Sequence, residues 1–374
     1  MTQAAPPYAD RRARLVERVE REGLDALWIT NLVNIHYLTG FTGSAAELLL
    51  TPNEPLFFTD GRYQEQVHEE VTGCAITVFK NETWSVVFSR QISEYGWKKI
   101  GYEAAHLTCE TFEKIGAQVQ KETAVEWIST TGWVESKRII KDETEIALLK
   151  ESSRIMDRVF EALLPEFREG VSEKEIERRL KNFLWEHGAT DPSFDPIVLF
   201  GARTSLPHGR PGENRLSKND WILLDFGALY EGYCSDCTRT FVFGTADETK
   251  KDRHSIVSQA YDAGAAAAKP GVPCKEVDTA ARELLVENGL GDAFAHGLGH
   301  GVGLEIHEGP RLAPTSNDTL EEGMVVTIEP GIYIPGWGGI RIENAVVVTD
   351  KGAVPLTHSH QDISPIDSAS EPRA

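Results

Sequence analysis

Residues 221–241 read WILLDFGALYEGYCSDCTRTF, and this stretch governs how the second half of the chain is interpreted. A strongly apolar run ends in Asp225, and a second acid, Asp236, follows eleven residues later, beside another β-prone run. This distance suits a hairpin that brings both acids to one place. A buried carboxylate is costly unless it is paired or bound to a metal ion. The stretch therefore predicts two adjoining strands whose acids need a partner.

Three further segments of the same half place ionisable side chains next to apolar, β-prone residues. Together with the hairpin they offer four acids and one imidazole, an oxygen-rich set that suits two divalent ions such as Mn²⁺, Co²⁺ or Zn²⁺. Two such ions would generate a hydroxide nucleophile near neutral pH and polarise a carbonyl group. The five candidate ligands are Asp225, Asp236, His300, Glu329 and Glu343.

Each candidate ligand also has an ordinary structural interpretation. An acid at a strand end, such as Asp225, is usually a solvated terminus, and Glu329 before Pro-Gly suits a turn. His300 lies in a glycine-rich loop, where it can act as a structural hydrogen-bonding residue. The metal site rests on the combination of these residues, and spacing alone leaves both interpretations open.

Several other kinds of site are disfavoured by the sequence. The alternating glycines of residues 297–303 do not form G-x-G-x-x-G, because Val302 occupies the position of the last glycine. No P-loop, H-E-x-x-H or G-x-S-x-G motif occurs. Cys234 and Cys237 form a single C-x-x-C pair, which without a second pair is a weak signal for zinc.

Length and composition set the broad class of the protein. The chain has 374 residues, 41% of them hydrophobic and 26% charged, which is typical of a globular protein with two domains. Its formal net charge is −20, so nucleic acid and membrane surfaces are poor candidates as partners. Residues 1–7 lack a signal-peptide pattern, and the five cysteines do not suggest a disulfide framework. We therefore expect a cytoplasmic protein.

The composition and the expected secondary structure of the chain change near residue 135. Short helices and strands alternate before it, which predicts an α/β domain with a mixed sheet over residues 1–135. Beyond it, Asp142 with Glu145 and Ser172 with Glu175 are typical of two capped helix starts. Glycine, proline and β-prone segments are expected to dominate residues 192–348.

The stretch HGLGHGVGLEIHE at 296–308 resembles the signature of the Xaa-Pro peptidases, the prolidases and aminopeptidases P of the "pita-bread" metallopeptidase group. The five candidate ligands match that group's metal ligands in order and local context. Residues 37–44 and 59–63 resemble the creatinase/aminopeptidase-P N-terminal domain. The resemblance implies an α/β creatinase-like domain at 1–135. It also implies an α+β pita-bread catalytic domain at 136–374, with helices covering a curved antiparallel sheet.

The resemblance also implies a role for each ligand. Asp225 would bind one ion with both oxygens, while Asp236 and Glu343 would bridge the two ions. His300 and Glu329 would complete the second ion's coordination. A bridging water or hydroxide would be the nucleophile, with Glu329 as its proton acceptor. The other catalytic residues that the resemblance implies are His208, His296, His307 and Arg341.

These four residues would act on the substrate. In the resembled group the matching histidines contact the scissile-bond region (His208), or line the proline pocket and stabilise the tetrahedral intermediate (His296 and His307). Arg341 matches an arginine near the metals or the substrate. The implied substrates are peptides with proline in second position. The implied assembly is a homodimer in which first-domain residues of one subunit shape the other's cleft.

The length of the preferred peptide is the most open question. A dipeptidase must recognise a free carboxylate directly after the proline, and an arginine is a natural device for this. The segment 332–340 is short and uncharged, so we expect an aminopeptidase P that releases the first residue from Xaa-Pro-Yaa peptides. The alternative is an Xaa-Pro dipeptidase in which Arg62, Arg203 or Arg210 supplies the charge. A non-catalytic interaction protein of the same fold is less favoured, because all five ligands are present.

Overall fold

The computed structural model describes residues 7–364, and the chain divides into two compact units between Arg138 and Ile139. Residues 1–6, which hold most of the stretch inspected for a signal peptide, lie outside the described part. Within the described part, none of the helices combines the length and the apolar character needed to cross a membrane.

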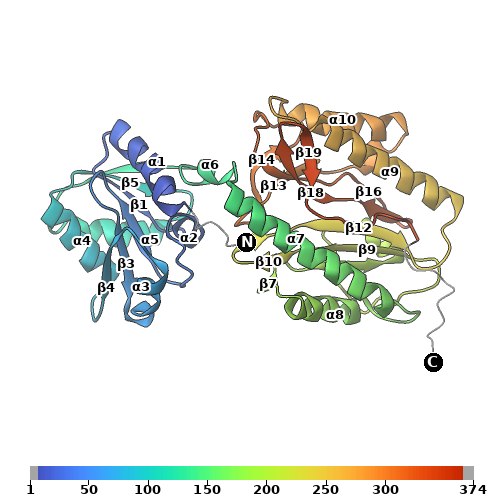
Figure 1. The fold of residues 1–374 in the computed structure, drawn as a ribbon, viewed down its shortest axis with the longest axis horizontal. Coiled ribbons are helices and arrows are strands. Elements are labelled where there is room, and N and C mark those ends of the chain that lie inside the picture. Colours follow the sequence, from blue (N-terminus) through green and yellow to red (C-terminus); the bar gives the residue numbers. More distant parts are fainter. Residues whose placement is uncertain (1–6, 365–374) are drawn as a thin grey trace. The chain divides into compact units, whose positions relative to one another are not determined.

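The first unit is built on one six-stranded sheet (Figure 1). Its strands are β1 (Ala26–Ile29), β2 (Glu47–Leu50), β3 (Leu56–Asp60), β4 (Ala75–Phe79), β5 (Lys99–Glu103) and β6 (Glu126–Thr130). Their order is β4-β3-β2-β1-β5-β6, in which β1 pairs antiparallel with β2 and parallel with β5. The prediction of a mixed sheet is therefore confirmed.

Helices cover this sheet because its strands are apolar on both faces. Ala26 and Trp28 of β1 belong to a buried cluster with Phe88 and Ile92 of one helix and Ile115 of another. The alternate residues of β1, Leu27 and Ile29, are equally buried and face the other side. The helices of the unit are α1 (Tyr8–Arg21), α2 (Leu32–Thr39), α3 (Gln66–Glu70), α4 (Trp84–Tyr95), α5 (Cys109–Val119) and α6 (Glu135–Arg138).

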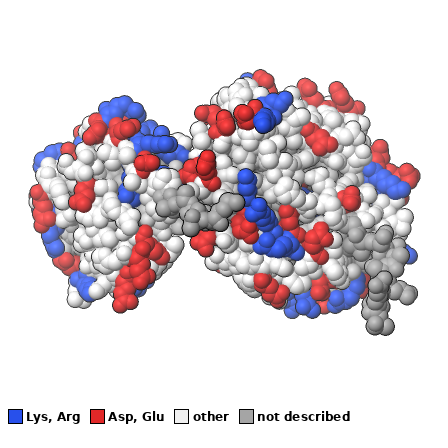
Figure 2. Space-filling model, in the orientation of Figure 1, with Lys and Arg blue, Asp and Glu red and all other residues white. Residues whose placement is uncertain are grey.

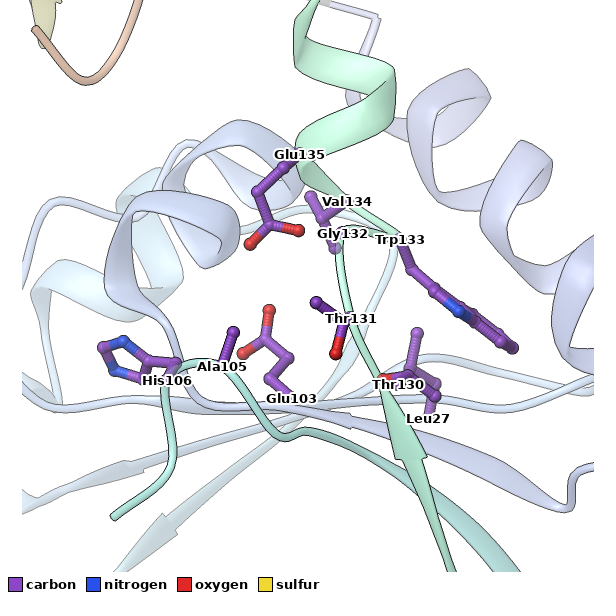
Figure 3. A pocket seen from close by; sticks show the side chains of 10 residues that line it. All are labelled: Leu27, Glu103, Ala105, His106, Thr130, Thr131, Gly132, Trp133, Val134 and Glu135. Carbon is purple, nitrogen blue, oxygen red and sulfur yellow. The ribbon is translucent and has the colours of Figure 1, made fainter. Parts of the chain in front are cut away.

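A small pocket lies beside the carboxyl ends of β5 and β6 (Figure 3). The carboxylates of Glu103 and Glu135 point toward each other there, and both accept a hydrogen bond from the Asn34 side-chain amide, at 2.6 and 2.7 Å. Glu103 also accepts the backbone N–H groups of Thr30 and Asn31 at 2.7 and 2.8 Å. This buried acid has a full set of donors, so its role is to fix the end of the strand.

The second unit begins with the two helices that their capping residues predict. Asp142 and Ser172 each form a complete capping box, with Glu145 and Glu175 respectively. Two further helices interrupt the segment 192–348, which we expected to be dominated by strands. One of them owes its weak sequence signal to alanine, which leaves little contrast between its faces. The four are α7 (Glu143–Leu163), α8 (Glu173–Glu186), α9 (Glu248–Ala267) and α10 (Cys274–Glu287).

Antiparallel strands fill the space between these helix pairs (Figure 1). The pair α7 and α8 packs on one set of strands, and α9 and α10 pack on another. The first set is β7 (Asp191–Pro192), β8 (Ile197–Phe200), β9 (Trp221–Phe226), β10 (Ala228–Tyr230), β11 (Tyr233–Cys234) and β12 (Cys237–Val242). The second set is β13 (Gly299–Gly301), β14 (Glu308–Leu312), β15 (Val325–Ile328), β16 (Gly331–Ile334), β17 (Gly338–Arg341), β18 (Asn344–Thr349) and β19 (Gly352–Pro355).

Acidic and basic side chains are interspersed on the molecular face drawn in Figure 2. The basic side chains along α7 lie beside acidic ones, and Arg154 and Arg158 both pair with Glu151 at 3.3 Å. Such exposed pairs contribute little to stability. The acids that need a chemical explanation are therefore the buried ones.

Candidate metal centre and active site

The predicted hairpin is present and brings the first two acids together. β9 and β12 pair antiparallel, with Thr238 opposite Asp225. Asp236 directly precedes β12, and the short strands β10 and β11 form the connection. Both acids are buried, with relative exposures of 8% for Asp225 and 5% for Asp236. The apolar strand residues around them supply the burial, as the sequence indicated.

A second strand pair brings the other ligand candidates to the same place. β15 and β18 pair antiparallel with Ile328 opposite Asn344, so Glu329 and Glu343 adjoin at the end of the pair. β13, which carries His300, lies on the other side of β15. The backbone N–H of Glu343 donates to the carbonyl of Thr238 at 3.2 Å and thereby joins the two sets of strands.

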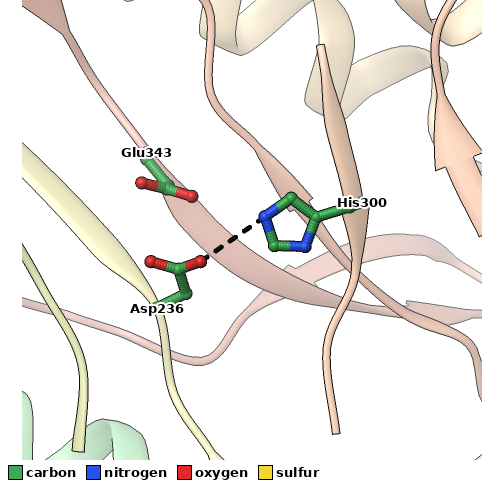
Figure 4. Close-up of side chains that lie close together, drawn as sticks. All are labelled: Asp236, His300 and Glu343. Carbon is green, nitrogen blue, oxygen red and sulfur yellow. Dashed lines mark ion pairs between the residues drawn. The ribbon is translucent and has the colours of Figure 1, made fainter. Parts of the chain in front are cut away.

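Three of the five candidates form a compact ligand set (Figure 4). One ligand atom each from Asp236, His300 and Glu343 lies within 4.8 Å of the others. The Nε2 atom of His300 is 3.6 Å from Asp236 Oδ2 and 3.5 Å from Glu329 Oε1. Its Nδ1 atom lies 2.9 Å from the Gly301 carbonyl oxygen, which can only accept, so Nδ1 carries the hydrogen. The lone pair of Nε2 therefore faces the acids, as in a metal-ligating histidine.

The electrostatics of this cluster match an ion site. Burial and the neighbouring acids raise the pKa of Asp236 and Glu343 well above their ordinary values. Burial raises the pKa of Glu329 to about 7 and lowers the pKa of His300 to about 4. The Oδ1 atom of Asp225 is buried without a hydrogen-bond partner. Buried acids that repel one another, with one oxygen unsatisfied, fit divalent cations.

Arg341 is the cation that the structure itself supplies. Its guanidinium is buried and donates to the Asp225 carboxylate, to the hydroxyl of Tyr333 at 2.6 Å and to the hydroxyl of Thr238 at 2.9 Å. Burial lowers the pKa of His296 to about 4, and its Nδ1–H donates to the Gly297 carbonyl. The Tyr333 hydroxyl therefore donates to His296 Nε2 at 3.0 Å. A continuous chain of hydrogen bonds links Asp225 to His296.

The two remaining predicted histidines also lie at this site. The rings of His307 and His300 meet edge to face at 73°, with their centroids 4.3 Å apart. Burial lowers the pKa of His307, with further lowering by the charges of Arg311 and His208. His208 is exposed, and the carbonyl of the residue before it accepts a hydrogen bond from Arg341. All the predicted site residues thus surround one region of the second unit.

Sequence reasoning missed three hydroxyl groups that organise the ligands. Thr238 accepts from Arg341 and donates to Glu343 Oε2 at 2.5 Å. Thr327 accepts the backbone N–H of His300 at 3.0 Å and donates to Glu329 at 3.3 Å. The two threonines lie two residues from a candidate acid, on the same face of an extended segment. That spacing could have revealed them. The third hydroxyl belongs to Tyr333, which no local pattern marks.

Two arginines also differ from what the sequence suggested. Arg203, one of the proposed anion binders, is occupied by Glu173, whose side chain is 0% exposed, and by the Arg210 carbonyl. Arg311 was not considered, yet it lies opposite His300 in the β13–β14 pair and is exposed. Its charge lowers the pKa of both His300 and His307, alongside the larger effect of burial. Arg311 is therefore an exposed guanidinium that adjoins the site.

Two family models match the chain, and they cover most of both units. Residues 11–140 match the creatinase/prolidase N-terminal domain, and residues 147–350 match metallopeptidase family M24.

Several known proteins are similar over nearly the whole chain. An Xaa-Pro dipeptidase from Bacillus anthracis is 39% identical with a TM-score of 0.91, over 95% of this chain and 99% of that one. An X-Pro aminopeptidase from Thermotoga maritima is 36% identical with a TM-score of 0.87, over 92% and 99%. An Xaa-Pro dipeptidase of Pyrococcus furiosus is 33% identical over 95% of this chain and 99% of its own length.

Proposed function

Because the chain belongs to metallopeptidase family M24, we propose that it hydrolyses Xaa-Pro dipeptides at the bond before the proline. Family membership makes the protein a metallopeptidase, and a divalent metal is implied with it. The two family matches also confirm the expected fold, a creatinase-like N-terminal domain followed by a pita-bread catalytic domain.

The comparisons favour a dipeptidase over the aminopeptidase P that we expected from the sequence. Two of the three relatives described above are named Xaa-Pro dipeptidases, and a prolidase from Pyrococcus horikoshii is 33% identical with a TM-score of 0.89. The expectation of an aminopeptidase rested on the short segment 332–340 alone. That segment forms the tight hairpin of β16 and β17, and its shortness says nothing about charges elsewhere at the site.

We assign the five predicted ligands to two divalent ions. The unsatisfied Oδ1 of Asp225 is available to bind an ion, while its Oδ2 accepts a hydrogen bond from Arg341. Asp236, from the first strand pair, and Glu343, from the second, have ligand atoms within 4.8 Å of each other, so both ions would share them. His300 and Glu329 would complete the second position, since Nε2 of His300 faces Glu329. When bound, such ions lower the pKa of water and polarise a carbonyl group.

The chain's own residues would hold and move the proton. Glu329, whose Oε1 lies 3.5 Å from His300 Nε2, would accept a proton from the attacking water and return it to the leaving proline nitrogen. Thr327 fixes the carboxylate of Glu329 for this task. His296, kept neutral and held by Tyr333, would line the proline pocket with His307.

The chemistry of the Xaa-Pro bond explains why a dedicated site is required. Proline has no amide N–H, so an enzyme cannot bind this bond through that donor. Rings such as those of His296 and His307 can instead recognise the pyrrolidine by shape. A site of this kind selects proline without needing the missing hydrogen bond.

Arg311 is our candidate for the group that recognises the free carboxylate of a dipeptide. It is exposed beside His300 and His307, whereas Arg203 and Arg341 are already paired. A guanidinium binds a carboxylate through two parallel hydrogen bonds, which favours a terminal proline over an internal one.

The test compares two substrates that differ only in that carboxylate. We expect Arg311→Gln to lower kcat/KM for an Xaa-Pro dipeptide by about 10- to 100-fold, as for loss of a charge-assisted pair. The corresponding Xaa-Pro amide should be hydrolysed slowly by the wild type and be affected little by the substitution. Arg179→Gln is the matched control, because it removes another exposed guanidinium of the second unit, from helix α8. Equal losses on both substrates would remove Arg311 from this role.

An aminopeptidase is the second candidate, favoured by the X-Pro aminopeptidase relative and by the hairpin 331–341, which has no basic side chain before Arg341. Rates on an Xaa-Pro dipeptide, a tripeptide and a pentapeptide separate the two activities. Our proposal requires the dipeptide to be cut fastest, and a clear preference for the longer peptides would establish the second candidate instead.

A further inference from the structure

The segment that carries His296 has an unusual source of support. Residues 294–298 precede β13 and belong to no strand, although the Leu298 carbonyl accepts the N–H of Glu329, directly after β15, at 2.8 Å. Side chains of α10 bind three other backbone groups of the segment. Arg282 donates to the carbonyls of Phe294 at 3.2 Å and His296 at 2.7 Å, and Asp278 accepts the N–H of Leu298 at 2.9 Å. Every second residue of the segment is thereby bound to one helix.

The two side chains are also bound to each other. Arg282 Nε and Nη2 donate to the two carboxylate oxygens of Asp278, at 2.8 and 2.9 Å. The guanidinium lies over the ring of Phe294, 4.2 Å from its centre, and that ring meets the His296 ring edge-on at 5.0 Å. The planar guanidinium of Arg282 is therefore fixed by a carboxylate, an aromatic ring and two backbone carbonyls.

A simple helix-stabilising pair would not need this arrangement. Exposed pairs four residues apart on a helix contribute little to stability. Asp278 has a relative exposure of 0%, and burying its charge is costly unless all its acceptors are used. The extra hydrogen bonds go to the segment of His296 and away from the helix. The arrangement is built to hold that segment.

We propose that Asp278 and Arg282 are positioning residues that set the placement of the His296 ring in the active site. Arg282 holds the backbone carbonyl of His296, and Tyr333 holds the far nitrogen of its ring. The backbone and the ring tip are thus fixed from two directions. This inference rests on the proposed function only for the part that His296 plays in hydrolysis.

The first test is a double-mutant cycle on hydrolysis of an Xaa-Pro dipeptide. Arg282→Lys keeps the charge but loses the fork, and we expect it to lower kcat/KM by about 10- to 100-fold, as for a misplaced active-site group. In a His296→Ala background the same substitution should lower kcat/KM by less than about twofold, because the ring that it positions is gone. Arg158→Lys is the matched control, since Arg158 also joins a carboxylate, Glu151, to a carbonyl, that of His187.

The second test does not depend on activity. In the NMR spectrum of histidine-labelled, metal-free protein, Arg282→Lys should shift the His296 ring resonance, identified by its absence in His296→Ala. The resonance of His254, another buried histidine bound to a carbonyl, should stay in place. If Arg282→Lys does not fold, Asp278→Asn/Arg282→Gln removes both charges and undergoes the same tests.

An equal loss of kcat/KM in the wild-type and His296→Ala backgrounds would overturn the inference. So would a His296 resonance that does not shift in Arg282→Lys. If the wild type hydrolyses no Xaa-Pro peptide, the proposed function fails while the resonance still decides whether the pair positions His296.

Discussion

Each unit of the protein buries acids, but the two groups of acids are satisfied in opposite ways. In the first unit, Glu103 accepts hydrogen bonds from two backbone N–H groups and from the Asn34 amide. In the second unit, Asp225 has a buried oxygen with no partner, and Asp236 faces other acids. Burial raises the pKa of Glu103 as it does that of Asp236, so a perturbed pKa does not distinguish them. The hydrogen-bond donors that surround each carboxylate do distinguish them.

This difference teaches how to separate a structural acid from a ligand. A carboxylate with all its acceptors filled has no capacity left for a cation. Buried acids that share one small volume and repel one another are unstable alone, and a bound cation removes that instability. The predictions below test this contrast, beginning with the largest effect.

The largest effect concerns the proposed base. Glu329→Gln should lower kcat for an Xaa-Pro dipeptide by about 10²–10⁴-fold, the usual contribution of a general base. The protein should remain folded, because the substitution removes a charge from a group of mutually repelling acids. Turnover is measured beside the thermal unfolding midpoint, with Glu103→Gln as the control that leaves turnover intact. Retained turnover in Glu329→Gln would remove Glu329 as the base.

The next effect is on the pH dependence of stability in metal-free protein. The pKa of Glu329 is about 7 in the folded chain and 4.5 when unperturbed, so the folded state binds the proton more tightly. Its stabilising contribution is therefore complete below about pH 4.5 and is lost as the pH rises toward 7. One pKa unit corresponds to about 1.4 kcal/mol, so the loss amounts to a few kcal/mol. The free energy of unfolding, measured with urea across this pH window, should vary less with pH for Glu329→Gln than for the wild type. An equally steep pH dependence in both proteins would contradict the shift.

The smallest predicted effect is a change in the free energy of unfolding that has opposite signs in the two units. Glu103→Gln should lower the free energy of unfolding by about 1–3 kcal/mol, because an amide group would face donors. Asp236→Asn should instead raise the stability of the metal-free protein, because it relieves repulsion from Glu343 and Asp225. Chemical denaturation of both variants without metal checks this. Destabilisation by both would mean that the second group is satisfied like the first.

Local sequence patterns predicted the parts of the fold that short-range chemistry determines. The helix starts at Asp142 and Ser172 follow from side chains within three residues of each other. The hairpin of β9 and β12 follows from two apolar runs close in sequence. The signal of α9 is weaker, because its alanines favour a helix but leave little contrast between its faces.

The site could be predicted only as far as its residues carry their own signal. The acids stand out in apolar strands, so the ligand candidates were found before any register was known. Tyr333 and Arg282 act through hydrogen bonds to a histidine 37 and 14 residues away, and only the tertiary structure reveals such contacts. Arg341 and Asp225 are 116 residues apart, and strand pairing alone makes them neighbours.

The most direct test of the central claim is calorimetric titration of metal-free protein with Mn²⁺, at a pH near 7.5 where the acids can ionise. We predict binding of two ions per chain to the wild type, and weakened binding to Asp236→Asn, which alters a carboxylate that both ions would share. Absence of Mn²⁺, Co²⁺ and Zn²⁺ binding to the folded wild type would contradict the account.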